Sequence, residues 1–477
     1  MRTRISSAVL AAAGAAVLGC KPSDVLSVPP PTGVLPGSAY QSQSGAEQIE
    51  ANGAAYLAAG FSQYQTSVLQ WGGLLSDEFQ YGDITYSGAW AGVDARMTEA
   101  LRGFQEPGDL AIQNLMAARL TLLTAVPLLE QYEPPSGKTK IAQAFALMGY
   151  TELLAAEDFC AGLPLASPTA NGVSYGTPLT TDSLLGVAEA HFDSAIAYAG
   201  SDPSVSPLAA IGLARTRLNR GHFAAAATGL AIVATGFVYN AELLPGGYNN
   251  GGLTTSNMYD YFTQYDGCAE AFTVDKKGQN GLNYVTAADP RLVFNTTLGE
   301  TCDALYSGSA DSVWYYPVKF GNPSTAVPLA TGVEARLIEA EAALQAGQVG
   351  TWSADLNALR ANAPGTYLAL ASGVPALTTD STTTASAAMR VDVMFRERAF
   401  WLYGMGSRLG DMRRLIRQYG RDQSTVFPIG PYPFGSDKTL PAPLPNYGTD
   451  VSLTLPTAAG SLTDPNSSYK GCVSKGA

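Results

Sequence analysis

The chain has 477 residues, of which 46% are hydrophobic and only 14% are charged. This composition provides enough apolar material for a folded core and excludes an intrinsically disordered chain. The formal net charge is −12. Because an acidic chain repels phosphate backbones, nucleic acid is excluded as an expected partner.

The first twenty residues have a three-part pattern. Arg2 and Arg4 give a positive start, and residues 8–17 form a short apolar stretch. The stretch ends in Val17-Leu18-Gly19-Cys20. This order is typical of an export signal, and the apolar stretch is too short to span a bilayer as a mature helix.

The end of this segment resembles a bacterial lipobox, in which the cysteine carries lipid. The resemblance implies that residues 1–19 are a signal peptide and that Cys20 anchors the mature chain. Lys21 follows the cysteine where an aspartate would favour inner-membrane retention, so we expect the outer membrane. An ordinary signal peptide with a chance cysteine is the alternative. Residues 20–45 are rich in Pro, Ser and Gly and predict a flexible tether.

Four further cysteines are Cys160, Cys268, Cys302 and Cys472. An exported chain lies in an oxidising compartment, so an even number of cysteines predicts two disulfides. Three pairings are possible. Cys268 and Cys302 close the short loop, and Cys160 with Cys472 would then tie the C-terminal tail to the body. The spacing gives no C-x-x-C and the chain has two His, so we expect no metal site.

Ala-rich segments after the tether carry apolar residues at intervals of three and four, which predicts helices with one buried face. They cover residues 47–66, 110–132, 138–158 and 181–199.

Helix pairs joined by tight turns predict a tetratricopeptide-like scaffold. Residues 208–219 would pair with 224–235. Residues 333–346 would pair with 352–363. The helices at 138–158 and 181–199 would form a third pair. Because the spacing between pairs is irregular, the pattern does not indicate a simple solenoid.

Three long segments lack a helical period: residues 68–108, 236–330 and 424–477. We expect short strands and loops in the first two, and a Pro-rich tail that packs back onto the helices in the third. Long loops of this kind are often functional. The predicted fold class is mainly α: a tetratricopeptide-like helical repeat scaffold with long loop insertions and a few short β-strands.

Charged residues and glycines near the C-terminus form an ordered series. It reads Arg396-Glu397-Arg398, Gly404-Met405-Gly406-Ser407-Arg408 and Asp411-Met412-Arg413-Arg414. Residues 333–342 form an upstream A-E-A helix, and Asp289-Pro290-Arg291-Leu292 forms a D-P-R element. We expect the helix charges to pair at three- and four-residue spacing, and the glycines to break the chain between helices. Anion binding by the arginines is the alternative.

This ordered set resembles the SusD/RagB family of surface nutrient-binding lipoproteins. The resemblance implies one SusD-like α-helical domain over residues 46–477. It also implies a cell-surface, lipid-anchored protein that binds a glycan or similar oligomeric nutrient, without a cofactor, and delivers it to a TonB-dependent, SusC-like β-barrel transporter in the outer membrane. The resemblance implies no enzymatic activity.

Catalytic patterns are weak. Gly172-Val173-Ser174-Tyr175-Gly176 matches G-x-S-x-G, but the surrounding prolines predict a loop and not the strand–turn–helix that a nucleophile elbow needs. We expect structural roles for His191 and His222. The adjacent acids Asp77-Glu78 and Glu157-Asp158 do not indicate the facing pair of a glycosidase.

Aromatic and amide residues in the long segments are the candidate ligand contacts, because rings stack on sugars and amides bond their hydroxyls. The candidates are Tyr81, Tyr86, Trp90, Tyr248, Asn249, Asn250 and Tyr284. The alternative is that these aromatic rings seal the loops onto the helices.

Three rival functions stay open. The chain could be an interaction lipoprotein whose repeats assemble other proteins, a surface polysaccharide hydrolase, or a protein that polymerises with itself.

Overall fold

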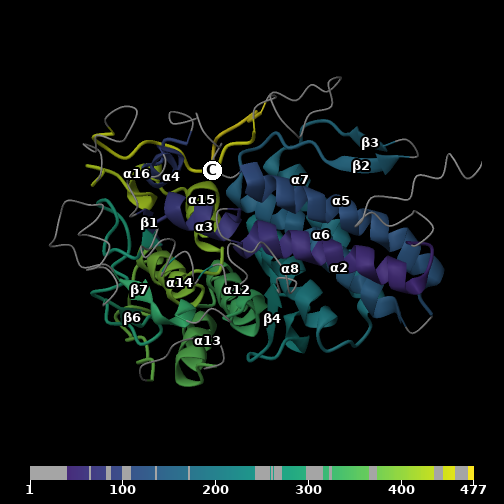
Figure 1. Ribbon diagram of the computed structural model, residues 1–477. Coiled ribbons are helices and arrows are strands. Elements are labelled where there is room, and N and C mark those ends of the chain that lie inside the picture. Colours follow the sequence, from purple (N-terminus) through teal and green to yellow (C-terminus); the bar gives the residue numbers. More distant parts are fainter. Residues whose placement is uncertain are drawn as a thin grey trace, which may run out of the picture.

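The structure is a computed structural model of the chain (Figure 1). It describes residues 40–63, 66–81, 88–98, 109–134, 137–169, 172–241, 258, 262, 271–296, 315–321, 325–364, 373–433, 444–456 and 471–477.

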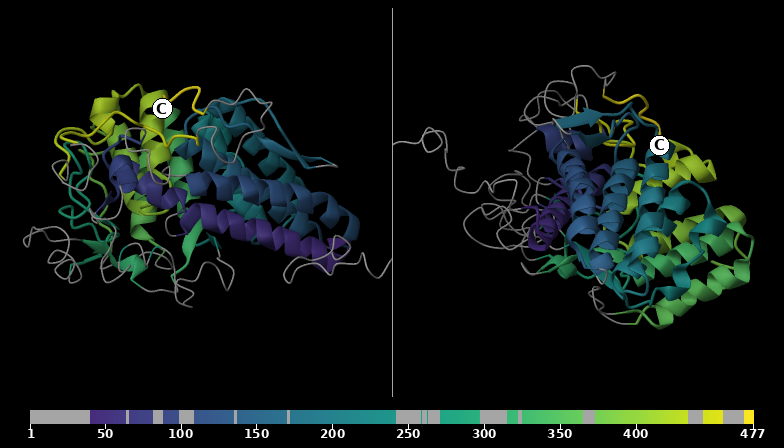
Figure 2. Two further views of the ribbon diagram at one scale, coloured as in Figure 1. Left: turned by 45° about the horizontal axis from the view of Figure 1, so that its top comes forward. Right: turned by 90° about the vertical axis from the view of Figure 1, so that its right-hand side faces the viewer.

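Long helices of the N-terminal half lie side by side (Figures 1 and 2). α2 (Gln43–Ser62) packs along α5 (Asp109–Tyr132), and α5 packs on α6 (Lys138–Asp158). α7 (Thr181–Ala199) covers α6, and α8 (Val205–Asn219) packs against both. The four helices predicted from the periodicity are confirmed, with the first shifted toward the N-terminus.

Side-chain caps fix where these helices begin. The Ser42 hydroxyl accepts a hydrogen bond from the Gly45 N–H at the start of α2, and Thr180 accepts one from Ser183 at the start of α7. Such caps satisfy backbone donors that have no partner within the helix. They explain why α2 begins at Gln43, before its apolar pattern is evident.

α5 is a long helix with a largely apolar stretch. Among the described residues it alone has the length and composition to cross a membrane. In the structure it packs between α2 and α6, and its Arg119 pairs with the buried Glu152 of α6 at 2.6 Å. The helix therefore forms part of the protein core.

Small residues let the helices approach closely around one ring. Phe192 of α7 lies against Gly149 of α6 and Gly212 of α8. A Cβ added at Gly212 would stand 2.1 Å from the ring, and one at Gly149 would stand 2.8 Å from it. Glycine at both positions is thus what permits this three-helix contact.

Among the described residues, the C-terminal half supplies four longer helices. α12 (Gly332–Gln345) and α13 (Val349–Ala361) form the second predicted repeat pair, which is confirmed. α14 (Ala387–Trp401) and α15 (Arg408–Tyr419) follow. α12 contacts α8 and α14, and α15 contacts α6, so one hydrophobic core joins the two halves.

The prediction of one continuous return helix over residues 224–235 is wrong. The chain forms only α9 (Phe223–Ala226) and the short 3-10 helix η3 (Leu230–Ile232). Gly229 between them has φ +89°, a left-handed conformation that ends an α-helix. The alanines around it suggested a longer helix than this glycine allows.

The strands within the described residues form short antiparallel pairs, of which β2–β3 is a local hairpin and the others join segments further apart in the chain. They are β1 (Gln80–Tyr81) with β5 (Ala271–Phe272), β2 (Ala166–Thr169) with β3 (Gly172–Tyr175), β4 (Val238–Ala241) with β8 (Val327–Thr331), and β6 (Phe294–Asn295) with β7 (Tyr316–Pro317). The 3-10 helix η4 (Val318–Phe320) and the short helix α16 (Gln423–Val426) complete the elements.

Two helices were missed in the segment 68–108. They are α3 (Val68–Leu75) and α4 (Gly88–Asp94). Every residue of α3 is buried. A helix that is apolar all round has no polar face, so its sequence shows no amphipathic period.

The residues of the SusD/RagB resemblance meet in the core as ion pairs. Arg398 lies 2.7 Å from Asp411, and Arg414 contacts Asp411 at 3.0 Å and Glu341 of α12 at 2.6 Å. All four side chains are buried. Their expected structural role is confirmed. Of these three pairs, however, only Asp411–Arg414 has the predicted spacing within one helix, and the other two join separate helices.

A second group joins the D-P-R element to α14. Arg291 contacts Glu397 at 2.9 Å and Asp289 at 2.7 Å. Arg360 of α13 also bonds Glu397. Burial opposes ionisation of Glu397, but the two guanidinium groups hold its pKa below the usual value.

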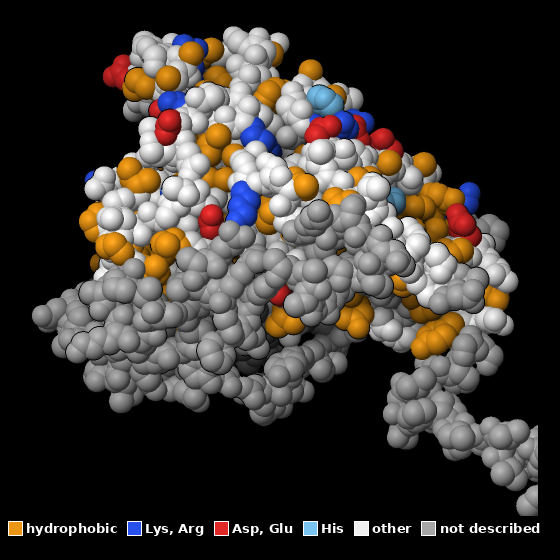
Figure 3. Space-filling view, turned by 90° about the horizontal axis from the view of Figure 1, so that it is seen from above, with side chains coloured by type: hydrophobic (Ala, Val, Ile, Leu, Met, Phe, Trp, Pro, Cys, Tyr) orange, Lys and Arg blue, Asp and Glu red, His pale blue; other side chains and the backbone are white. Residues whose placement is uncertain are grey.

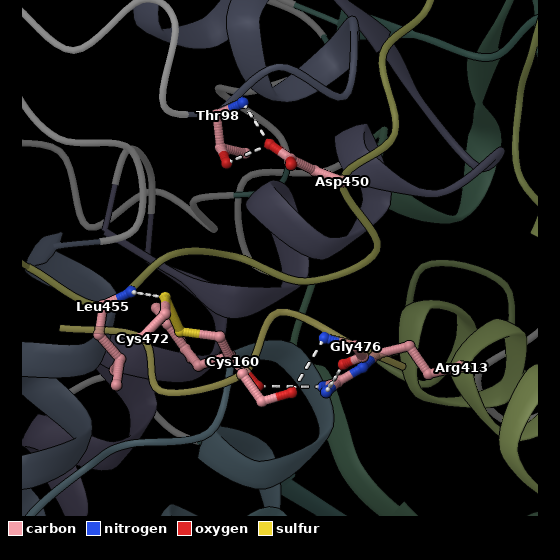
Figure 4. Close-up of a disulfide and its surroundings, with 9 residues drawn as sticks. Thr98, Cys160, Arg413, Asp450, Leu455, Cys472 and Gly476 are labelled. Carbon is pink, nitrogen blue, oxygen red and sulfur yellow. Dashed lines mark hydrogen bonds between the residues drawn. A yellow bond between two sulfur atoms is a disulfide. The ribbon is translucent and has the colours of Figure 1, made fainter.

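The C-terminal tail packs onto the end of α6, as predicted. Cys160 and Cys472 form a disulfide with an S–S distance of 2.02 Å, which confirms one predicted pairing (Figure 4). Beside it, the Arg413 guanidinium donates to the Phe159 carbonyl at 3.1 Å and to the Gly476 carbonyl at 3.4 Å. Cys268 and Cys302 lie outside the described residues.

Removing this disulfide by the double change Cys160→Ala and Cys472→Ala is expected to lower the free energy of unfolding by about 2–5 kcal/mol, because the cross-link restricts the unfolded chain. Urea denaturation measures the effect. Val473→Ala, beside the bridge but 69% exposed, is the control and should change stability by less than about 0.5 kcal/mol. Equal stability of the double variant and the parent chain would contradict the prediction.

Asp158 at the end of α6 is an acid without an ion pair among the described residues. It is 1% exposed, and its Oδ2 has no hydrogen-bond partner. Burial, followed by repulsion from Glu157, raises the pKa of Asp158 well above its usual value. The folded chain therefore binds a proton at Asp158 more tightly than the unfolded chain does.

Asp158→Asn is expected to flatten the pH dependence of stability. Because the folded-state pKa is raised, the stability of the parent chain falls as pH rises from about 4 toward that pKa, at up to about 1.4 kcal/mol per pH unit. The asparagine cannot ionise and removes this loss. Chemical denaturation between pH 4.5 and 8 tests it, with the exposed Asp380→Asn as control. Parallel profiles for Asp158→Asn and the parent chain would refute the assignment.

Candidate binding site

Three aromatic rings meet where α3, β1 and α4 converge. The rings of Trp71 and Trp90 have centroids 4.1 Å apart, and Tyr81 stacks on Trp90 at 5.8 Å with an interplanar angle of 13°. We call Trp71, Tyr81 and Trp90 the aromatic cluster. The sequence pointed to the aromatic residues of the segment 71–90, which include Trp71, but only Tyr81, Tyr86 and Trp90 among them were expected to contact the ligand.

The aromatic cluster is more deeply buried than an open platform. Tyr81 is 1% exposed, Trp71 5% and Trp90 8%. The rings pack on one another and on the core, as the alternative in which they seal the loops would predict. The indole N–H of Trp71 is buried without a hydrogen-bond partner. A ligand role for Tyr81 and Trp90 stays a prediction.

A buried ion pair holds the cluster in place. Asp94, at the end of α4, pairs with Lys277 at 2.5 Å. Its other oxygen accepts hydrogen bonds from the Tyr81 N–H at 3.2 Å and from the Tyr432 hydroxyl at 2.9 Å. Burial raises the pKa of Asp94 and lowers that of Lys277, and the pairing opposes both shifts.

Lys277 fixes the segment between α3 and β1. Its ammonium donates to the carbonyls of Leu74, Ser76 and Phe79, the last at 2.8 Å. An ammonium has three donors and no acceptor, so this one side chain can bind all three carbonyls of the turn. No sequence pattern indicated this role, because Lys277 lies in a polar segment without a motif.

Tyr284 is a core residue. It is fully buried, and its ring packs against Phe400 at 5.3 Å and Tyr403 at 5.2 Å. Its ring has no face open to a ligand in this structure, which corrects the expectation for this residue. Other sequence candidates lie outside the described residues: Cys20, Tyr86, Tyr248, Asn249 and Asn250.

The adjacent acids before β1 serve the fold. Asp77 pairs with Arg408 through two contacts of 2.6 and 2.9 Å, and Glu78 accepts a hydrogen bond from the Gly404 N–H at 3.0 Å. Burial raises the pKa of Glu78 to about 7 and lowers that of its neighbour Lys319 to about 8. Both acids are buried, so neither faces an open cleft.

The remaining catalytic candidates either bond other side chains of the fold or lie within a strand. Glu157 makes two contacts with Arg215, at 2.8 and 2.6 Å. His191 bonds Glu152 at 2.7 Å, as its structural reading predicted. Ser174 lies within β3, opposite Ser167 of a hairpin. The prediction of a loop at this position is wrong. A serine inside a strand is nevertheless not at the sharp turn that a nucleophile elbow requires.

The described surface on the face shown in Figure 3 carries mixed charge. On the described part of the face in Figure 3, Lys and Arg side chains lie close to Asp and Glu, and hydrophobic side chains are dispersed among polar ones. Exposed ion pairs such as Arg220–Asp182, at 3.0 Å, are typical. This part of the surface has no broad field of one sign that would select a strongly charged polymer.

Known protein structures share this arrangement of helices. A SusD-like carbohydrate binding protein from Bacteroides vulgatus matches with a TM-score of 0.56 and 16% identity, over 78% of this chain and 83% of that one. A surface glycan-binding protein A from Bacteroides uniformis matches with a TM-score of 0.55 and 12% identity, over 87% and 96%. A second Bacteroides vulgatus protein, of the SusD superfamily, matches with a TM-score of 0.55 and 11% identity, over 81% and 90%.

Sequence comparison alone is less sensitive here. No family model matches the sequence, and no curated protein matches it. At identities this low the structural likeness establishes the fold, and it does so over most of the length of each protein. The chain therefore has the fold of the SusD superfamily.

Proposed function

We propose that the chain is a SusD-family lipoprotein of the bacterial cell surface that binds an oligosaccharide and delivers it to a TonB-dependent β-barrel transporter. The observation that carries the proposal is the fold, shared over most of the chain with proteins described as carbohydrate-binding and glycan-binding. Binding without turnover fits the adjacent acids Asp77-Glu78, which are buried and engaged by the fold.

The proposed glycan site is the surface at the aromatic cluster. Trp90 is the most exposed of the three rings, at 8%, and is the one that would contact the C–H face of a sugar. Tyr86 lies between Tyr81 and Trp90 in the sequence and would supply a further ring.

The anchor and the transporter rest on the sequence. Residues 1–20 resemble a lipoprotein signal with Cys20 as the lipidated residue, and the ordered motifs from Asp289 to Arg414 resemble those of a family whose members cover such barrels. A lipid anchor holds a protein at the membrane without spanning it. A body tethered in this way can stay close to a barrel in the same membrane.

Trp90→Leu and Tyr86→Ala are each expected to weaken oligosaccharide binding by about tenfold or more, because each removes a ring that stacks on the ligand. Calorimetry against a panel of oligosaccharides identifies the ligand of the parent chain and then measures both variants. Tyr56→Ala, an exposed ring on α2, is the matched control and should bind as the parent does.

Thermal unfolding separates loss of binding from loss of fold, since Trp90 is part of the core. A folded parent chain that binds none of the oligosaccharides would refute the glycan proposal. Unchanged affinity of both ring variants would move the site away from the aromatic cluster.

A further inference from the structure

A polar pocket lies between α12, α13 and the turn that follows η3. Its volume is about 250 Å³. Glu339 and Arg336 reach it from α12, Asp355 and Asn362 from α13 and its end, and Thr235 from the turn. We call this the α12–α13 pocket. A space of this size suits one small ligand and not a long oligomer.

The backbone builds the α12–α13 pocket by a close approach. Gly332 begins α12, and a Cβ added there would stand 2.0 Å from the Ala234 carbonyl and 2.6 Å from that of Thr235. Only glycine lets the turn lie this near the start of α12. The Arg336 guanidinium then reaches back to the Leu230 carbonyl of η3 at 2.8 Å.

The charges in the pocket do not balance. Arg336 is one cation, and its Nε lies 3.1 Å from Glu339 without the alignment of a hydrogen bond. Glu339 and Asp355 are two carboxylates. Burial raises the pKa of Glu339, the attraction of Arg336 lowers it, and the weaker repulsion from Asp355 raises it. Burial also raises the pKa of Asp355. An added positive charge would relieve this repulsion.

The other groups favour a compact polar molecule. The Asn362 amide nitrogen bonds the Ala358 carbonyl at 3.1 Å, which leaves the amide oxygen directed elsewhere as an acceptor. Thr235 adds a hydroxyl, and the buried Leu359 gives an apolar wall. Carboxylates and an amide oxygen accept from an ammonium, while the hydroxyl and the guanidinium match ligand hydroxyls.

We propose that the α12–α13 pocket binds a small polar molecule through a primary ammonium group held between Glu339 and Asp355. The ammonium belongs either to an amino sugar or to a lysine side chain. The site is separate from the proposed glycan site: Figure 1 places α4 near the top of the molecule and α13 at the bottom. The pocket therefore stands independently of the proposed function.

Calorimetry on the full chain tests the proposal with glucosamine, N-acetylglucosamine, glucose and Nα-acetyl-lysine methylamide as probes. Glucosamine should bind about tenfold or more tightly than N-acetylglucosamine and glucose, which keep the ring but lose the charge. If the lysine derivative binds and glucosamine does not, the ammonium site stands and its source is a peptide.

Asp355→Asn and Glu339→Gln should each weaken binding of the ammonium probe about tenfold, while Asp380→Asn, an exposed acid elsewhere, should leave it unchanged. Three outcomes would overturn the proposal: no binding of either amine, equal binding of glucosamine and N-acetylglucosamine, or unchanged affinity of the Asp355→Asn and Glu339→Gln variants. Oligosaccharide binding in the same samples reports on the aromatic cluster separately.

Discussion

The buried charges around α15 hold the two halves of the molecule together. Arg414 joins α15 to Glu341 of α12, and Arg408 joins it to Asp77, between α3 and β1. A buried ion pair costs desolvation to form, but removal of one partner leaves an unpaired buried charge and costs about 3–5 kcal/mol. The main effect of these ion pairs is therefore to favour one arrangement of the helices over others. Their net contribution to the free energy of unfolding is smaller.

The same pairings lead from the scaffold to the proposed glycan site. Asp77 lies within the turn whose carbonyls Lys277 binds, and that turn leads into β1, which carries Tyr81. Asp94 links this turn to β1, because it pairs with Lys277 and accepts a hydrogen bond from the Tyr81 N–H. The position of the aromatic cluster is thus set by buried polar contacts with the core, while the segments beyond it are free to differ in sequence.

Much of the scaffold could be predicted because its helices have one apolar face, as at 110–132 and 181–199, and because the motifs from Asp289 to Arg414 occur in order. The sequence could not reveal α3, which is buried on all sides, or the end of α9 before Gly229. The site was harder to predict: burial of Tyr81 and the partners of Lys277 depend on contacts between segments about 200 residues apart.

The central claim is that this helical body serves a transporter at the outer membrane. Gentle detergent extraction of the tagged, lipidated chain from its own membrane, followed by identification of the proteins that co-purify, tests it most directly. The account predicts a large TonB-dependent β-barrel in a fixed ratio to the chain. Recovery of the chain alone, or of an ordered polymer of the chain, would contradict the transporter role and favour an assembly function.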